Sequence, residues 1–450
     1  MTRLPRSNDA AGPRLASIES LLAAGVAVGL LFIGISVAGY GTTYSQLRLV
    51  ALDISVGAVF LAFMSALIHR RAQADVLAIL AILYFVWSGI QDASQADTLG
   101  AILDLVGASM SYAATLASLR KVLSGLRRWI LVVVITSLLP ALLGQGFGPG
   151  RVWFGLTQGR YFGFSNPDAL GFIAGLALLL SLPVLRFTHG RILAALSGLL
   201  YVISATNTAA IATGAAVAAY YFVAKNRATR HLRGGAAVLA AVTVGVLTWI
   251  PTNQAMNAFE SLSQKISLSS RTLLWFELLQ SARDSGYFWT GMGDGGVAHY
   301  TVAILGVATA HTTILQMLLS KGFFTTVFFI VVAVVAANRT LGKVASKPSR
   351  DHCLAFAVVI YWFVTSLVST QPGTPLGLML LVLIAIPHPD DESESDRSLN
   401  ANLDDSGVSP DLSRGGRGRQ RPRQTAAQNQ PFGDGHAAAK VLEALREGSA

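Results

Sequence analysis

Long apolar runs recur along most of the chain, and they constrain its fold more than any other feature. Runs such as Leu21 to Ala38 and Ala236 to Ile250 reach or approach the roughly 20 residues that an α-helix needs to cross about 30 Å of hydrocarbon. The 450-residue chain is also 52% hydrophobic and only 13% charged, against roughly 25% charged residues in a soluble domain. We therefore predict an all-α protein, a polytopic bundle of about twelve transmembrane helices in a lipid bilayer.

The runs and the loops between them place the predicted helices at residues 19–40, 46–68, 75–91, 99–119, 128–145, 168–186, 190–205, 206–224, 234–251, 310–338, 353–370 and 374–388. Basic residues near helix ends are retained in the cytoplasm, so a correct helix count puts them on alternate sides. With the N-terminus inside, the inner segments before the tail hold 19 Lys and Arg residues and the outer segments hold seven. The pattern predicts that both termini are cytoplasmic.

Three parts of the chain differ in composition. Residues 1–18 form a cytoplasmic N-terminal segment, residues 19–388 form the transmembrane domain, and residues 389–450 have too few apolar residues for a packed core. We predict that this last part is a disordered cytoplasmic tail. Five of the seven outer basic residues lie in two long outer loops near 146–167 and 252–309, so we expect the chemistry there.

Two classes of function are disfavoured by residue usage. The formal charge of +10 does not indicate a nucleic-acid-binding protein, because the Lys and Arg residues lie between apolar segments and not on one face. The single cysteine, Cys353, can form no internal disulfide and has no metal-ligand pattern around it.

The first long outer loop ends with the start signature of a helix. Asn166 can cap the helix, and Pro167 suits its first position. Arg160 stands just ahead of it, and free backbone N–H groups and the helix dipole favour an anion such as phosphate there. Arg151 lies in the same loop. The alternative interpretation is that both arginines only contact lipid headgroups.

The second long outer loop contains the pattern of an amphipathic helix. Ser269 or Ser270 can cap it, and the helix dipole disfavours the cation of Arg271 in the first turn unless an anion neutralises both. A solvated surface arginine is the alternative. The apolar face of the helix is formed by Leu274, Leu278 and Ala282.

The sequence GMGDGG at 291–296 formally matches the glycine fingerprint of dinucleotide-binding folds, but no strand precedes it and no βαβ unit surrounds it. Its glycines instead indicate a tight turn that brings the loop back over the helices. His311 follows at the outer boundary, where it could serve as a general base or could simply contact water or headgroups.

Four short motifs follow one another in these outer segments. They are R-x-x-G-F-x-N-P from Arg160 to Pro167, S-R-x-x-x-W with Ser270, Arg271 and Trp275, G-x-G with Gly291 and Gly293, and Ala-His ending at His311. In this order and position they resemble the O-antigen ligase and O-antigen polymerase superfamily of bacterial membrane glycan ligases and polymerases. The resemblance covers about residues 150–340.

The resemblance implies a transferase of the cytoplasmic (inner) membrane, acting in polysaccharide biosynthesis for the cell envelope. Such proteins move a glycan from an undecaprenyl diphosphate carrier to a glycan or lipid acceptor, without a metal ion or another cofactor. Carried over residue by residue, Arg160 and Arg271 would hold the diphosphate and His311 would activate the acceptor hydroxyl. Further contacts to the diphosphate or glycan would come from Arg151, Asn166, Ser270 and Trp275.

Other functions remain open at this level. A ligase and a polymerase differ only in acceptor, which the sequence does not separate. Metal-dependent polyprenyl-phosphate glycosyltransferases typically carry acidic residues in the first outer loop, and residues 40–46 contain none. A transporter is the alternative from a different class, because carboxylates inside a membrane are costly and often mark ion paths. Its candidate residues are Asp53 and Asp104, although capping or interhelical hydrogen bonding also explains them.

Overall fold

The computed structural model describes residues 17–34, 41–69, 75–142, 147–153, 156–161, 167–204, 206–225, 278–280, 282–293, 296–297, 312–346, 349–367, 369–370 and 374–387. All of them belong to the first of two units, Met1–Asp391. The second unit, Glu392–Ala450, lies outside the described residues, and so does the whole of the predicted tail at 389–450.

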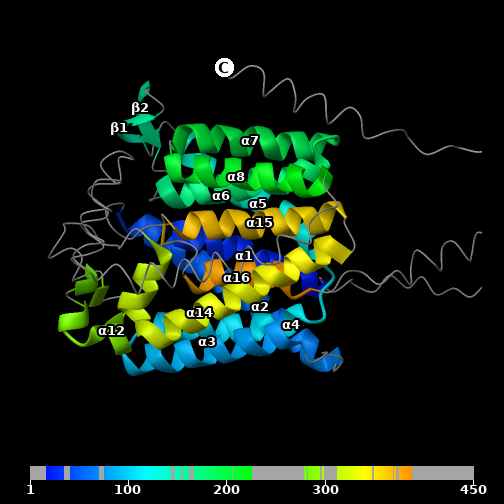
Figure 1. Cartoon of the computed structure of the whole chain (residues 1–450). Helices are drawn as coiled ribbons and strands as arrows, with labels where there is room; N and C mark the ends of the chain where they lie inside the picture. Colours follow the sequence, from blue (N-terminus) through cyan, green and yellow to red (C-terminus); the bar gives the residue numbers. More distant parts are fainter. Residues whose placement is uncertain are drawn as a thin grey trace, which may run out of the picture. The chain divides into compact units, whose positions relative to one another are not determined.

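Helices make up most of the described part and run side by side (Figure 1). Their bounds are α1 Ile18–Gly34, α2 Gly41–His69, α3 Val76–Ser94, α4 Thr98–Ala114, α5 Leu119–Leu142, α6 Pro167–Ser181, α7 Thr188–Ser204, α8 Asn207–Lys225, α12 Tyr287–Thr290, α14 Thr313–Ser346, α15 Arg350–Ser366 and α16 Pro375–Ala385. A 3-10 turn, Leu182–Val184, follows α6. Every predicted helical segment that falls on described residues overlaps one of these helices. The segment at 234–251 lies outside them, so the count of twelve stays a prediction.

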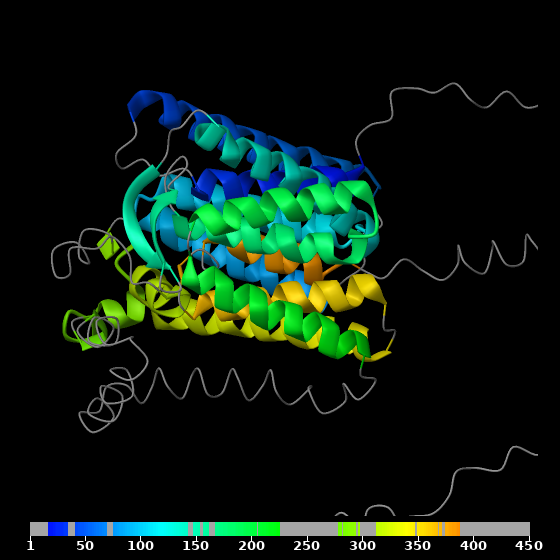
Figure 2. The ribbon, with the colours of Figure 1, turned by 90° about the horizontal axis from the view of Figure 1, so that it is seen from above.

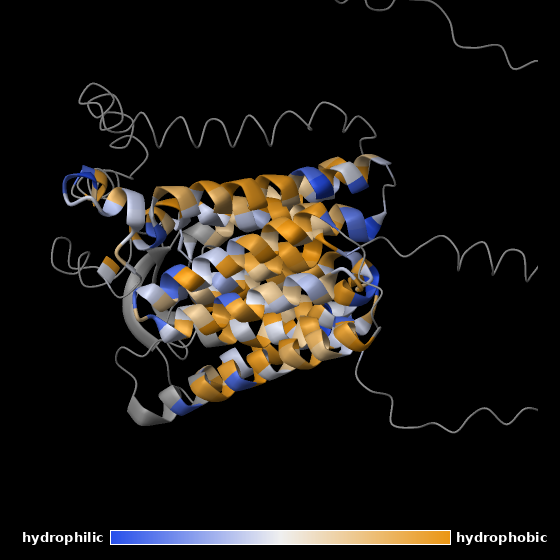
Figure 3. Ribbon diagram, turned by 90° about the horizontal axis from the view of Figure 1, so that it is seen from below, coloured by the Kyte–Doolittle hydropathy of each residue, from blue (hydrophilic) through white to orange (hydrophobic). Residues whose placement is uncertain are grey.

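The helices suit a lipid bilayer. Five stretches in the described part are long and apolar enough to cross a membrane: Leu49–Ile68, Val76–Ser94, Leu119–Leu142, Pro167–Val184 and Thr313–Ser346. Large apolar side chains such as Leu61, Ile90 and Leu105 are more than half exposed on the outer helix faces. Such exposure is unfavourable in water but not in lipid. Figure 3 shows apolar residues along the middle of the helices and polar residues toward their ends. The chain is a helical membrane protein.

Helix α16 forms the centre of the bundle (Figure 1). Its residues from Leu376 to Ala385 are all buried, as expected of a helix that is hydrophobic on every side. It begins sharply because Thr374 accepts a hydrogen bond from the Gly377 N–H and Pro375 occupies the first helical position. Trp362 of α15 donates to the Gly377 carbonyl at 2.9 Å, which joins this start to a neighbouring helix.

The C-terminal end of α16 is neutralised by cations from α14. Arg339 donates to the Ile386 carbonyl at 3.0 Å, and Lys343 donates to the Ala385 carbonyl at 2.9 Å. Basic side chains are favourable there because the last carbonyls of a helix carry partial negative charge. Arg339 also pairs with Asp75, the residue that caps the start of α3. One cation therefore ties three helices together.

These contacts correct two predicted helix bounds. The expected helix at 310–338 continues to Ser346, and the one at 128–145 already begins at Leu119, so Arg127 and Arg339 lie within helices and not in loops. Hydropathy ends where charged residues begin, whereas the helix continues because its cations find protein partners. Arg127, for example, donates to the Leu180 carbonyl at 3.1 Å and to Asp351 at 3.3 Å.

Candidate functional site

The loop expected near 146–167 contains a β-hairpin that the sequence analysis did not predict. Strand β1, Phe147–Trp153, pairs antiparallel with β2, Leu156–Tyr161, and the register places Arg151 opposite Gln158 and Arg160 opposite Gly148. Residues 148, 150 and 159 are glycines, which are disfavoured in strands, so the sequence does not predict this pairing. Helix α6 begins at Pro167, as predicted.

The hairpin and α12 lie at the same end of the bundle, as Figures 1 and 2 show from two directions. We call this the hairpin end. Most of the predicted site residues there lie outside the described residues: Asn166, Ser270, Arg271, Trp275 and His311. For Arg151 and Arg160 the backbone is described and the side chain is not. What the structure does describe is the framework that carries these residues.

The first part of this framework is the turn at 291–293. Gly291, Gly293 and Gly322 all have positive φ values, of 72°, 76° and 77° respectively, and Gly322 interrupts α14. A Cβ at Gly291 would collide with the Ser320 carbonyl oxygen, so glycine lets the two backbones touch. The Met292 N–H donates to the Leu319 carbonyl at 2.8 Å. The predicted return of this loop onto the helices is therefore confirmed at Gly291 and Gly293.

Gln91 of α3 holds this turn and α14 together. Its side-chain amide donates to the Thr290 and Lys321 carbonyls, both at 2.6 Å. Its oxygen accepts from the Thr325 hydroxyl at 2.9 Å, and that hydroxyl in turn accepts from the Trp87 indole N–H at 3.0 Å. One side chain thus satisfies the carbonyl of Thr290 at the end of α12 and that of Lys321 beside the break in α14 at Gly322.

A buried charge cluster adjoins the break in α14, because Lys321 directly precedes Gly322. The Lys321 ammonium pairs closely with the Asp92 carboxylate and lies 3.9 Å from Asp104 Oδ2. The three residues are 5%, 1% and 1% exposed, and they join α14, α3 and α4. Burying ions without partners costs several kcal/mol each, so a charge cluster inside an apolar bundle needs this mutual compensation. Two carboxylates around one ammonium still leave an excess of negative charge when all three are ionised.

The two carboxylates considered from the sequence therefore have different environments. Asp104 belongs to this cluster, whereas Asp53 is exposed on α2. Lys321, one of the seven basic residues that the predicted topology assigns to outer segments, is buried, and the sequence analysis does not single out Asp92 or Gln91. The signal that could have found Lys321 and Asp92 is the cost of placing an ionisable side chain within an apolar run, applied to every such residue.

An apolar contact completes the attachment of the second outer loop. Leu278 and Ala282, from the predicted amphipathic face, are fully buried against Leu315, Leu318 and Leu319 in the first turns of α14. Residues 278–280 and 282–284 are helical, and Leu274 lies outside the described residues. These two residues of the predicted apolar face therefore pack on protein.

The start of α14, immediately after His311, is fixed to the end of α15. The Thr312 hydroxyl donates to the Ser366 carbonyl at 3.3 Å, and the Thr313 hydroxyl donates to the Ser369 carbonyl at 2.7 Å. Both threonines are buried. The backbone directly after His311 is therefore anchored, although the histidine itself lies outside the described residues.

An apolar pocket of about 120 Å³ opens between α14 and α15 near this point. Its walls include Ile314, Phe329, Trp362, Phe363 and Leu367. An apolar cavity of about 150 Å³ stays dry and holds a molecule the size of benzene, and this somewhat smaller pocket has room for a hydrocarbon segment of about five carbon atoms.

No metal-binding set is evident in the part of the chain that the structure describes, where no group of three or more His, Cys, Asp or Glu side chains could hold an ion. No known protein-family profile matches the chain, and no curated protein is recognisably similar to it in sequence. The interpretation of the site therefore depends on its own residues.

Proposed function

We propose that the protein is a membrane glycosyltransferase of the O-antigen ligase and polymerase type. It moves a glycan from a polyprenyl (undecaprenyl) diphosphate to an acceptor hydroxyl on the outer face of the cytoplasmic membrane. The observation that carries the proposal is the start of α14, where the position after His311 is anchored by Thr312 and Thr313 and an apolar pocket begins at Ile314. A lipid-linked donor needs this combination of a polar group at the boundary and an apolar site beneath it.

The pocket suits the lipid part of the donor. One isoprene unit is a five-carbon branched segment, comparable in size to the benzene-sized guest of a cavity of about 150 Å³. Because the pocket lies between two membrane helices, the rest of the polyprenyl chain could continue into the bilayer. The diphosphate would then stand at the level of His311.

The positions of the segments next to Arg160 and Arg271 support a common site for these two cations. Arg160 lies on β2 just ahead of the start of α6, and Arg271 precedes the loop segment that packs on α14 through Leu278. The hairpin and this attachment lie at one end of the bundle (Figure 2). In the proposed site, both guanidinium groups bind the diphosphate, for which paired N–H donors are well suited.

The proposed reaction forms one bond and breaks one. The acceptor oxygen attacks the anomeric carbon, and the bond between that carbon and the diphosphate oxygen breaks with its electron pair leaving on the diphosphate. The charge that grows on this leaving group is stabilised by Arg160 and Arg271, which lowers the barrier. His311 takes the acceptor proton. Attack from the face opposite the leaving group inverts the anomeric centre.

The test is transfer by the purified full-length protein from a synthetic undecaprenyl-diphosphate glycan, in chelator, with donor binding measured separately. Arg160→Lys and Arg271→Lys should lose both donor binding and turnover, because an ammonium cannot make paired contacts to phosphate oxygens. His311→Ala should retain donor binding and lose roughly 10²–10⁴-fold in rate. The exposed Arg283→Lys in the same loop is the matched control and should keep full activity. Full activity in all variants, or a strict need for a divalent metal, would refute the proposal.

A second candidate, transport of a small cation or proton, rests on the buried cluster of Lys321, Asp92 and Asp104. Intramembrane carboxylates with excess negative charge are a common feature of ion paths. The cluster equally well serves to hold α14 to α3 and α4 beneath the loop. Asp104→Asn separates the two functions, because it should abolish coupled transport but leave glycan transfer in place wherever the protein still folds.

A further inference from the structure

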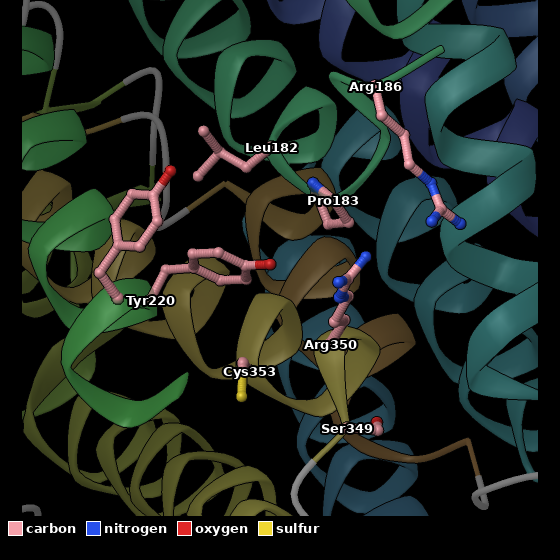
Figure 4. Close-up of a pocket in the computed structure, with 8 residues that line it drawn as sticks. Leu182, Pro183, Arg186, Tyr220, Ser349, Arg350 and Cys353 are labelled. Carbon is pink, nitrogen blue, oxygen red and sulfur yellow. The ribbon is translucent and has the colours of Figure 1, made fainter. Parts of the chain in front are cut away.

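A second, more polar pocket lies at the opposite end of α15 from the proposed transfer site. It has a volume of about 540 Å³ and lies between the turn after α6, the end of α8 and the start of α15. This volume is within the roughly 300–1,000 Å³ typical of sites for small molecules. Figure 4 shows Arg186 and Arg350 extending into this region from different elements, with Pro183 between them.

The two arginines of this pocket have no anionic partner in the described part of the chain. Neither makes a hydrogen bond or an ion pair there, and the polar contact of Arg186 is with the face of the Phe187 ring, 4.6 Å from the guanidinium carbon. Arg127, by contrast, binds a carboxylate and a carbonyl. No acidic side chain is among the pocket lining, and the neighbouring Asp351 faces Arg127. The pocket therefore has a net positive charge.

A tyrosine adds a further possible donor. Tyr220 lines the pocket and is 8% exposed, and its hydroxyl makes no hydrogen bond to another described residue. A phenol hydroxyl can donate to an anion beside two guanidinium groups.

The start of α15 adds a third element. Ser349 caps this 17-residue helix by accepting from the His352 N–H at 3.1 Å, and Arg350 occupies the first helical position. A cation in the first turn is disfavoured by the positive end of the helix dipole unless an anion lies between them. Its placement here makes sense if the pocket holds an anion.

We propose that this pocket binds the phosphate group of a phosphorylated ligand, with Arg186, Arg350 and the Tyr220 hydroxyl as donors. The pocket is larger than a phosphate ion alone, and Leu182 and Pro183 give it an apolar wall for the attached organic group. Two sources present this chemistry, an anionic phospholipid headgroup or a soluble phosphate compound. The site is distinct from the transfer site and does not depend on glycosyl transfer.

The test uses the purified full-length protein in two formats. Inorganic phosphate is titrated by calorimetry in detergent free of anionic lipid, and retained lipid is counted by native mass spectrometry after reconstitution in phosphatidylcholine with or without phosphatidylglycerol. Saturable binding of phosphate alone indicates a soluble ligand, and selective retention of phosphatidylglycerol indicates a headgroup. Both outcomes support the site.

Variants show whether binding occurs in this pocket. The double substitution Arg186→Gln and Arg350→Gln should weaken binding at least about tenfold, because each contact is a charge-assisted hydrogen bond. Tyr220→Phe removes one oxygen and keeps the packing, so it should weaken binding severalfold and serves if the double variant fails to fold. Arg128→Gln, at an exposed position outside the pocket, is the control. No saturable binding by the parent protein, or equal loss in the control, would overturn the proposal.

Discussion

The two ends of the bundle use charge in different ways. At the hairpin end, Lys321, Asp92 and Asp104 are at most 5% exposed, and the ammonium pairs with both carboxylates across three helices. At the opposite end, where α15 begins, Arg186 and Arg350 are exposed and have no anionic partner in the described part. Buried charges that are paired inside the protein fix geometry, whereas exposed unpaired cations are free to bind ligands. The opposite end also contains an internal pair, Arg339 with Asp75, so what distinguishes it is the additional presence of unpaired cations.

Among substitutions at the two ends, loss of Lys321 should reduce the stability of the folded protein most. Lys321→Met leaves two buried carboxylates without their cation, which should destabilise the folded protein by roughly 3–5 kcal/mol. The measurement is the denaturation midpoint in mild detergent. Lys121→Met is the matched control, because that side chain is 68% exposed, and it should shift stability by no more than about 0.5 kcal/mol. Equal effects of the two substitutions would remove the distinction between the ends.

Substitution of Gly322, which makes a close backbone contact, should have the next largest effect on stability. Gly322→Ala introduces a Cβ at a positive φ against the Trp289 carbonyl, and should cost about 1–3 kcal/mol and loosen the second outer loop. Gly342, in the same helix, has open space around it. Gly342→Ala should therefore be neutral or stabilise by up to about 1 kcal/mol. Protease sensitivity of the loop, measured alongside the denaturation midpoint, distinguishes local loosening from global unfolding.

At the opposite end, Arg339→Gln should have a smaller effect. It removes the partner of Asp75 and one contact to the end of α16, while Lys343 still neutralises the neighbouring carbonyls. We expect a loss of about 1–2 kcal/mol. The exposed Arg128→Gln should change stability by less than about 0.5 kcal/mol. A loss in Arg339→Gln as large as that in Lys321→Met would mean that both ends depend equally on internal ion pairs.

Removal of residues 395–450 should have the smallest effect. The segment is polar and, in the predicted topology, cytoplasmic, so transfer by the truncated protein should equal that of the full chain. The assay compares the two at equal abundance in the membrane. Lost activity at normal abundance would show that the tail acts directly in the reaction.

Local sequence signals predicted much of the fold. Apolar length located the helices, and the glycines of 291–293 predicted a turn that the contact of Gly291 with α14 confirms. Hydropathy failed where α5 and α14 continue through Arg127 and Arg339, because these cations find partners in distant segments. It also gave no sign of the hairpin, whose strands are rich in glycine.

The candidate site was less predictable, for a physical reason. Lys321 and Asp92 are 229 positions apart, and only the packing of α14 against α3 brings them together. A sequence can show that a buried charge needs a partner but does not say which one. The roles of Arg160, Arg271 and His311 stay predictions based on motif order, and the structure adds anchored segments near them in the sequence.

The central claim is that the hairpin end faces outward. The direct measurement is labelling of single cysteines by a membrane-impermeant thiol reagent in intact cells, in a Cys353→Ala background. Gln158→Cys on β2 and Gln264→Cys in the second loop should react in intact cells, and Ser346→Cys at the end of α14 should react only after lysis. Labelling of Ser346→Cys in intact cells, with protection of both outer positions, would contradict the topology and the proposed active face together.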